Sequence, residues 1–341
     1  FLAAMATKLT QKQLAYQLGV SVATISRVLN DKPGVSDEIR ERVLELMAQA
    51  GYAPNGAARS LATSRTGLIA FVVHQSNHDS REDPFYPFIV AGAESFLSSQ
   101  QVHILFTSLD DDTLQKPQTF TAVAERRVDG LILAGPDISA NFILYHLSQG
   151  VPLVMIDNCL QNSEVNCVLN DDFGGEYQAA RHLIQKGRRK IVFLSGPLEW
   201  VSSRERGRGY AQALSEAHLP PQVVHTAETT ITSGEQAMAE ALERWPELDG
   251  VCAANDAMAI GAMRVLTARG RRIPQEVAVF GFDDIGWSTL TTPPLSTVHV
   301  YKRQLGVLAA QRLLDVIADP KLPPVKVISG TRLTLRQSTG D

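Results

Sequence analysis

Acidic, amide, guanidinium and aromatic side chains follow four of the short apolar runs in this sequence. They are Asp157 and Asn158 after 152–156, Trp200 and Arg204 after 190–196, Asn255 and Asp256 after 250–254, and Asp283 and Asp284 after 277–282. Planar hydrogen-bonding groups of this kind bind hydroxyls, and aromatic rings cover the C–H face of a sugar. The residue types therefore favour a binding site for a sugar.

Several of these side chains also have a structural interpretation. Asp256 stands where it caps a helix beginning at Ala257, and we expect a structural role for it. Asp284 is expected to be a cap or a loop partner. Trp200, and Trp287 close to Asp283, are equally compatible with packing in the core.

The polar side chains reach one place only if the runs before them are neighbouring parallel strands. From residue 67 onward, apolar runs alternate with amphipathic stretches, which predicts parallel sheets covered on both faces. The expected strands are 68–73, 102–107, 130–134, 152–156, 190–194, 223–226, 250–254 and 277–282, and the expected helices are 176–186, 202–217, 235–244, 257–269 and 305–318. Open sheets of this kind bind ligands outside the carboxyl ends of their strands.

The alternation breaks at residues 158–172, about half-way along these runs. Such a break indicates a crossover between two sheets, whereas a closed parallel barrel, the structural alternative, continues the alternation. The fold class we expect for the body is therefore α/β, with two lobes that each contain a doubly wound parallel sheet.

The pattern of residues 6–53 predicts three short helices instead. Thr10 and Gln13 fit a capping box, Gly19 ends the first helix, and Ser21 and Ser36 can cap the second and the third. Two short helices joined by a tight turn with glycine form a helix-turn-helix. The expected headpiece is small and all-α.

The second of these helices carries the side chains that suit DNA. Its first residues would meet base edges in the major groove, with Arg27 paired to guanine and Val22 and Ala23 against thymine methyl groups. Short polar side chains suit phosphates. The candidates for contact with DNA in this segment are Ser21, Val22, Ala23, Thr24, Ser26, Arg27 and Asn30. The alternative is a three-helix module that binds a protein or nothing.

Composition excludes several other classes. The 341 residues are 44% hydrophobic and 20% charged, with a formal net charge of −4, so nucleic acid is not bound through bulk positive charge. Three cysteines without metal-binding spacing predict no disulfide framework, no metal site and a reducing compartment. No apolar run approaches the length of a membrane span. We expect a cytoplasmic protein that makes no contact with membranes.

Several motifs together resemble the lactose/galactose repressor (LacI/GalR) family of transcription regulators. They are Val20-Ser-Val-Ala-Thr-Ile-Ser-Arg-Val-Leu-Asn30, Gly51-Tyr-Ala-Pro-Asn55, Ala58-Arg-Ser-Leu-Ala62, Ala254-Asn-Asp-Ala-Met-Ala-Ile-Gly261, Gly281-Phe-Asp-Asp284 and Pro293-Pro-Leu-Ser-Thr-Val298. The resemblance covers nearly the whole chain. It implies a headpiece that binds operator DNA, and a body similar to periplasmic sugar-binding proteins. It also implies a bacterial cytoplasmic protein associated with the nucleoid.

The resemblance also implies roles for individual residues. A hinge helix containing Asn55, Ala58 and Leu61 is expected to fold on the operator, with Leu61 inserted into a central minor-groove step. Arg204, Asn255 and Asp283 align with positions that contact the effector, and Phe85 and Tyr86 match a motif that lines the same cleft. With the strand-end residues, the expected effector site is Phe85, Tyr86, Asp157, Trp200, Arg204, Asn255, Asp283 and Trp287.

The expected domains follow from these boundaries. Residues 1–5 are interpreted as a leader or a cloning remnant, 6–53 as the headpiece, and 54–66 as the hinge helix and linker. The N-terminal lobe is expected at 67–170 and about 300–325, and the C-terminal lobe at 171–298 and about 326–341.

The function this predicts is a sequence-specific transcriptional regulator, most simply a repressor, controlled allosterically by a sugar or sugar derivative between the lobes. The expected partners are a pseudo-palindromic operator and a second copy of the chain; a tetramer is disfavoured because no leucine heptad follows Pro324. Alternatives are a regulator controlled by a nucleobase or by a protein, and, more distantly, a sugar-binding protein without a DNA function. We expect no enzyme, no catalytic residues and no cofactor, because no nucleophile with a base and an orienting group is recognisable.

Overall fold

A computed structural model describes residues 10–29, 33–49, 65–75, 84–160 and 165–341 of the chain. The chain divides into two compact units, Phe1–Thr66 and Gly67–Asp341. The expectations for residues 1–5, for Asn30 and for the hinge residues Asn55, Ala58 and Leu61 lie outside the described residues.

The headpiece consists of α1 (Gln11–Leu18), α2 (Val22–Leu29) and α3 (Asp37–Gln49). The predicted capping box of α1 is present: Gln13 N donates to Thr10 Oγ1 at 3.3 Å, and Thr10 N donates to Gln13 Oε1 at 2.8 Å. Gly19 ends the helix with a φ of 66°. The helices bury one small core, whose members are Leu14, Ala15, Ile25, Val28, Val43 and Met47.

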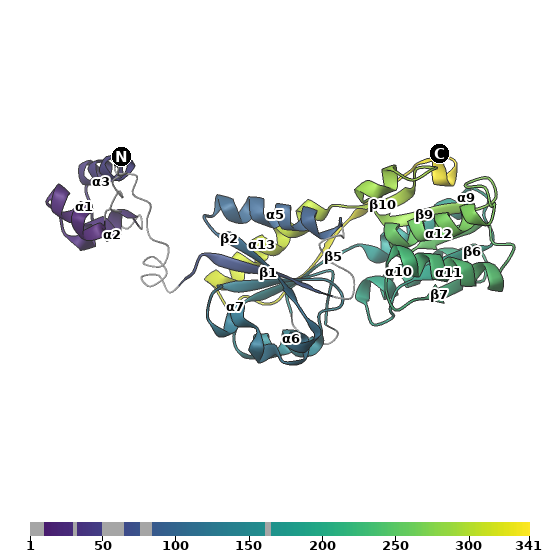
Figure 1. The fold of residues 1–341 in the computed structure, drawn as a ribbon, viewed down its shortest axis with the longest axis horizontal. Helices are drawn as coiled ribbons and strands as arrows, with labels where there is room; N and C mark the ends of the chain where they lie inside the picture. The colour runs from purple at the N-terminus through teal and green to yellow at the C-terminus, as the bar shows by residue number, and fades with distance from the viewer. Residues whose placement is uncertain (1–9, 30–32, 50–64, 76–83, 161–164) are drawn as a thin grey trace, which may run out of the picture. The chain divides into compact units, whose positions relative to one another are not determined.

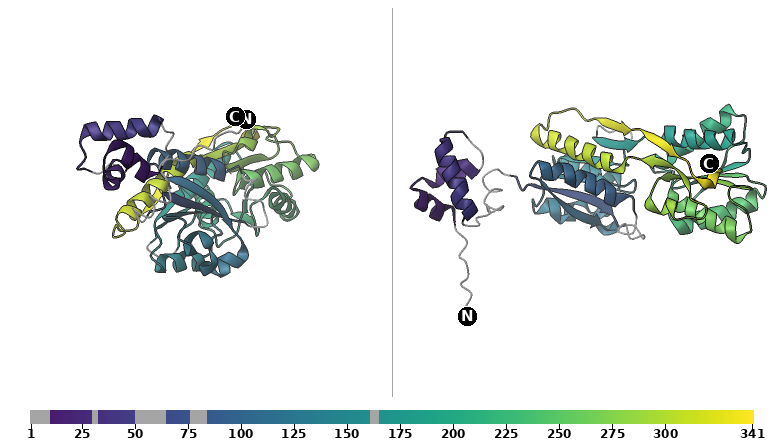
Figure 2. Two further views of the ribbon diagram at one scale, coloured as in Figure 1. Left: turned by 60° about the vertical axis from the view of Figure 1, so that its left-hand side comes forward. Right: turned by 90° about the horizontal axis from the view of Figure 1, so that it is seen from above.

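The first lobe of the body contains a parallel sheet in the order β11-β5-β4-β3-β1-β2. Its strands are β1 (Leu68–His74), β2 (His103–Leu109), β3 (Gly130–Ala134), β4 (Leu153–Ile156), β5 (Cys167–Asn170) and β11 (Lys326–Ser329). Helices α5 (Tyr86–Ser99) and α13 (Lys302–Ala318) lie side by side on one face (Figure 2). The other face carries α6 (Asp111–Gln115), η1 (Pro117–Thr119), α7 (Thr121–Ala124) and α8 (Ala140–Ser148) (Figure 1).

The second lobe has a sheet in the order β12-β10-β9-β8-β6-β7, in which β12 runs antiparallel to β10. Its strands are β6 (Ile191–Ser195), β7 (Gln222–His225), β8 (Gly250–Ala253), β9 (Ala278–Asp283), β10 (Ser296–Val300) and β12 (Thr331–Thr334). The helices are α9 (Asp172–Gln185), α10 (Val201–Glu216), α11 (Ile231–Arg244) and α12 (Asp256–Ala268), with short turns η2 (Gly286–Thr289) and η3 (Gln337–Thr339). The prediction of two open sheets instead of one barrel is confirmed.

The chain crosses between the lobes after β5, after β10 and between β11 and β12 (Figure 1). The last crossing differs from the expected boundary at about residue 326, because β11 still belongs to the first sheet. Its Lys326 is paired with Cys167 in a parallel register along β5. The chain changes lobe at Gly330, and only the residues from β12 onward belong to the second lobe.

Close packing between α9 and α10 explains a pair of glycines inside α10. A Cβ atom on Gly209 would lie 2.2 Å from the carbonyl oxygen of Phe173, whereas a Cβ on Gly207 would meet only Phe193 Cε1, at 3.7 Å. A backbone oxygen at 2.2 Å cannot be accommodated without separating the helices. The first glycine is therefore replaceable, and the second is required for the packing.

We expect Gly209→Ala to destabilise the body by about 2 kcal/mol or more, because the new methyl group must displace α9. Gly207→Ala is the matched control in the same helix, and it should be neutral or stabilising by up to about 1 kcal/mol through helix propensity. Urea unfolding of the two variants measures both effects. Equal stabilities would contradict the packing argument.

Candidate effector site

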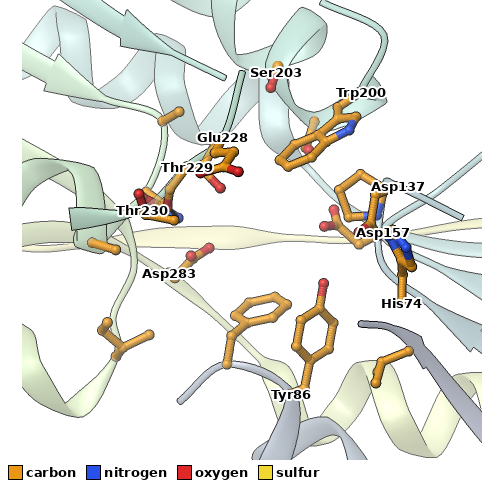
Figure 3. Close-up of a pocket in the computed structure, with 18 of the residues that line it drawn as sticks. His74, Tyr86, Asp137, Asp157, Trp200, Ser203, Glu228, Thr229, Thr230 and Asp283 are labelled. Atoms are coloured by element: carbon orange, nitrogen blue, oxygen red, sulfur yellow. Dashed lines mark hydrogen bonds and ion pairs between the residues drawn. The ribbon is translucent and has the colours of Figure 1, made fainter. Parts of the chain in front are cut away.

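A cavity of about 690 Å³ lies where the carboxyl ends of the strands in the two lobes face each other. Figure 3 shows its lining, with Tyr86 and Asp157 from the first lobe and Asp283 and Thr230 from the second directed into one space. Most of the residues expected here do line it: Phe85, Tyr86, Asp157, Trp200, Asn255, Asp283 and Trp287. Asp157, Asn255 and Asp283 therefore lie around one cavity, as their positions after the strands predict.

Arg204 is the exception among the expected residues. It does not line the cavity, and its Nη1 atom donates to the carbonyl oxygens of Leu198 at 3.3 Å and Glu199 at 2.9 Å. The arginine that lines the cavity is Arg206. Side chains two residues apart on an α-helix point in directions that differ by about 200°. Arg204 and Arg206 therefore lie on nearly opposite sides of α10. The expectation for Arg204 was wrong by half a turn.

Arg206 is the buried charge of the site, with 6% of its surface exposed. Its Nε donates to Asp172 Oδ1 at 2.9 Å, its Nη1 donates to the carbonyl oxygen of Ala254, and its Nη2 lies 3.8 Å from Asp283 Oδ1. The guanidinium carbon lies 3.8 Å from the centre of the Phe282 ring. Burial alone lowers the pKa of Arg206, but the carboxylates outweigh burial and raise it.

Asp157 follows β4 and is directed to the same space from the other lobe. Its φ of 57° lies in the left-handed region, as does the φ of 106° at Asp283. Asp157 is 8% exposed, and its Oδ1 has no hydrogen-bond partner among the residues that the structure describes. Burial, with the charge of Asp172 nearby, raises its pKa well above the ordinary value. Strained backbone and an unsatisfied buried acceptor are typical of a ligand site.

Asn255 organises the cavity wall as well as lining it. Its Oδ1 accepts from Met258 N at 2.9 Å and so caps α12, while its Nδ2 donates to the carbonyl oxygen of Thr229 at 2.9 Å. The side chain thereby ties the loop before α11 to the start of α12. Asn255, and not Asp256, is the helix cap.

The other strand-end residues have structural roles. Asp256 is fully buried and accepts from Ile285 N at 2.9 Å and Thr297 Oγ1 at 2.5 Å. Asp284 is a loop partner, as expected, and pairs with Arg336 at 2.6 Å and His299 at 2.8 Å. Asn158 donates from Nδ2 to the carbonyl oxygens of Gly135 and Ile138.

One polar group of the first lobe was not predicted from the sequence. His74, at the end of β1, lies 2.7 Å from Asp137 Oδ2 through Nδ1 and 3.1 Å from Asp111 Oδ1 through Nε2. The hydrogen bond with Asp137 raises the pKa of His74 above its ordinary value. All three residues line the cavity. His74 follows the run 68–73 and Asp137 follows the run 130–134, so the strand-end rule, applied to every strand, would have found both.

The second helix of the headpiece presents the side chains expected for DNA. Ser21, Val22, Ala23 and Arg27 are exposed. Thr24 and Ser26 are half-buried on the same helix. Ser21 caps α2 as predicted, because its Oγ accepts from Thr24 N at 3.0 Å.

Two family comparisons cover most of the chain. Residues 10–55 match the family described as bacterial regulatory proteins, lacI family, and residues 66–334 match periplasmic binding proteins and sugar binding domain of LacI family. The chain belongs to the LacI family. It therefore has the DNA-binding headpiece and the two-lobe body of a transcriptional regulator of this family.

Similarity to individual LacI-family regulators extends over nearly their full lengths. The HTH-type transcriptional regulator CelR of Thermobifida fusca is 34% identical over 333 residues, which are 96% of this chain and 98% of that protein. A solved transcriptional regulator CelR–cellobiose complex has a TM-score of 0.75 at 32% identity, covering 97% of this chain and 100% of that one. The Lac repressor dimer bound to operator and the anti-inducer ONPF has a TM-score of 0.82 at 27% identity, covering 98% and 99%.

The described part of the chain lacks two kinds of feature. Among its helices, none combines the length and apolar character that a transmembrane span needs. Its His, Cys, Asp and Glu side chains form no group of three or more that could hold a metal ion.

Arg206→Met is expected to destabilise the body by about 3 kcal/mol, because Asp172 would be left buried without its cation. Arg204→Ala removes an equal charge from the same helix and should change stability by less than about 0.5 kcal/mol. Chemical unfolding of both variants provides the comparison. A stable Arg206→Met protein would show that the guanidinium does not hold the carboxylates in place.

Glu176 of α9 offers a pH-dependent test of the buried interior of the second lobe. Its carboxyl is fully buried beside the Cys252 thiol, and burial raises the pKa of Glu176 from 4.5 to about 8. A carboxyl with a raised pKa supports folding while it is protonated, so wild-type stability should fall as the pH rises from about 4.5 to about 8. Glu176→Gln cannot ionise and should flatten this dependence. Thermal melting of both proteins across that pH range measures the effect. Parallel curves of stability against pH would refute the assignment of the pH dependence to Glu176.

Proposed function

We propose that this LacI-family regulator represses transcription and that a sugar in the cavity between the lobes controls its affinity for operator DNA. The observation that carries the proposal is the cavity itself. Acidic side chains from both lobes, the Asn255 amide and aromatic rings converge at the carboxyl ends of two parallel sheets. Carboxylates accept hydrogen bonds from sugar hydroxyls, and rings cover the C–H faces.

Control of DNA binding follows from the connections of the lobes. A ligand that contacts Asp157 and Asp283 at once stabilises one arrangement of the two lobes over another. Strand β1 begins at Leu68, directly after the segment that joins the headpiece to the body. A shift of the first lobe therefore changes the position of the headpiece attachment. The coupling is reciprocal, so operator DNA changes sugar affinity by the same factor.

The DNA contacts are proposed for the exposed face of α2. Arg27 would pair with guanine, and Val22 and Ala23 would contact thymine methyl groups. We propose a homodimer on a pseudo-palindromic operator, with Asn30, Asn55, Ala58 and Leu61 as further contacts. The relative bound to operator is a dimer. Two headpieces supply the affinity that one weakly charged headpiece lacks.

We also propose that the chain has no enzymatic activity. His182, one candidate for a general base, is bonded to Asp341 at 2.9 Å and does not line the cavity. Ser202 and Ser203 do line it. Neither serine has a hydrogen bond to a histidine among the contacts of the described residues.

Operator release by sugars tests this function. An operator is first selected from a random duplex library with the full chain, and gel shifts then follow release by neutral sugars, amino sugars, uronates and nucleobases. We expect at least one of the uncharged or amino sugars to change operator affinity by about tenfold, in the range of allosteric coupling. Release by a nucleobase alone, or by no small molecule, would contradict a sugar effector.

The proposed contact of Arg27 with DNA can be tested against a matched control. Arg27→Ala should cost about 1–3 kcal/mol of operator affinity and relax base preference at one position of each half-site. Arg42, exposed on α3, carries the same charge, and Arg42→Ala should leave base preference unchanged. Unaltered sequence selection by Arg27→Ala would exclude α2 as the reading helix.

A further inference from the structure

The cavity carries more negative than positive charge. Its lining contains five carboxyl groups, namely Asp111, Asp137, Asp157, Glu228 and Asp283, against one guanidinium and one imidazole. Burial favours the protonated form of Asp157, and the other four carboxyl groups still outnumber the two basic groups. Arg206 is bonded to Asp172, which does not line the cavity, so part of its charge is already compensated behind the wall. His74 lies between Asp137 and Asp111. The field inside the cavity therefore disfavours an anionic ligand such as a uronate or a phosphorylated sugar.

Asp157 identifies the place where a hydrogen-bond donor is required. Its side chain is more than nine-tenths buried, lines the cavity, and leaves Oδ1 without a partner among the described residues. An acceptor in that state costs free energy that a donor on the ligand would recover. An ammonium group on the ligand would donate a hydrogen bond to Oδ1, and its positive charge would compensate the negative charge of the cavity.

Aromatic faces lie close to this carboxylate. Figure 3 shows Tyr86 and Trp200 directed into the same space as Asp157 and Asp283. The ring of Phe85 packs edge-on against that of Tyr86, with 5.5 Å between the ring centroids. Aromatic faces attract cations through the ring quadrupole. The remaining polar lining consists largely of hydroxyl side chains, namely Ser202, Ser203, Thr229, Thr230 and Thr232. Hydroxyls and an amide suit a polyol, whereas carboxylates and rings suit a cation.

We propose that the effector is an amino sugar whose ammonium group binds the Asp157 carboxylate, and that neutral sugars of the same shape bind more weakly. This inference rests on the proposed function and narrows its ligand class. It also predicts movement of a proton. Burial favours the protonated carboxyl of Asp157, so binding of an ammonium ion should form the carboxylate and release that proton to the buffer.

Matched ligand sets test the proposal by isothermal titration calorimetry on the full chain. One set is glucose, glucosamine and N-acetylglucosamine, and the other is cellobiose, the disaccharide of glucosamine and its diacetylated form. The members of each set share their ring stereochemistry and differ only in the C2 substituent, which is a hydroxyl, an ammonium or an acetamido group. In at least one set we expect the amine to bind about tenfold tighter or more than both neutral members, as a charged hydrogen bond predicts. Titration in buffers of different ionisation enthalpy should report proton release for the amine alone.

Two variants control for general charge effects. Asp157→Asn should abolish the preference for the amine and its proton release, and it should fold, because Oδ1 has no protein partner to lose. Asp112→Asn removes the same charge from an exposed residue of α6 that does not line the cavity, and it should keep the preference. A preference that persists in Asp157→Asn would overturn the assignment of the ammonium group to this residue.

The outcomes separate this inference from the function on which it rests. A neutral sugar that binds as tightly as its amine and releases operator would overturn the amino-sugar proposal and leave sugar control intact. Binding of neither class, with release by a nucleobase or by nothing, would overturn both. Tighter binding of the amine, with proton release and operator release, would support both.

Discussion

A single buried guanidinium organises the centre of the body. Arg206 joins the start of α9 through Asp172, the end of β8 through the Ala254 carbonyl, and the end of β9 through Asp283. Strands β8 and β9 are followed by residues that line the cavity, whereas Asp172 lies behind the cavity wall, so one side chain ties this part of the wall to α9. A buried charge of this kind is tolerated only while its partners remain in place. The same ion-pair network that holds the second lobe together therefore also fixes the acceptors that a ligand meets.

The parts of this structure that could be predicted from the sequence are those with a local physical cause. The capping box at Thr10 and the glycine that ends α1 depend on neighbouring residues only, and the apolar runs of the central strands are recognisable in the sequence itself. Position at a strand end located Asp157, Asn255 and Asp283 in the cavity, because the topology of open parallel sheets makes that edge the binding edge.

The features that were not predicted from the sequence depend on contacts between residues that are far apart in the chain. Strands β5 and β11 contain the polar residues Asn170, Lys326 and Ser329 and pair with each other although every element from α9 to α13 lies between them in the sequence, so their own residues carry little signal. Arg204 and Arg206 are chemically identical, and only the phase of α10 against its sheet decides which one is buried. No sequence pattern predicts that His146 is buried in the first lobe against Phe142. Burial lowers the pKa of His146 to about 4.

The net charge of the chain is a sum over two sites that need opposite charges. Contact with DNA needs a few well-placed cations, such as the exposed Arg27 on α2, and not a basic body. The cavity needs acceptors, and it collects carboxylates around one compensated arginine. The two sites lie in separate compact units of the chain, so their charges are set by different residues. The average charge is thus uninformative about either site, whereas the burial and partners of Arg206 and Asp157 describe the charge that the cavity presents.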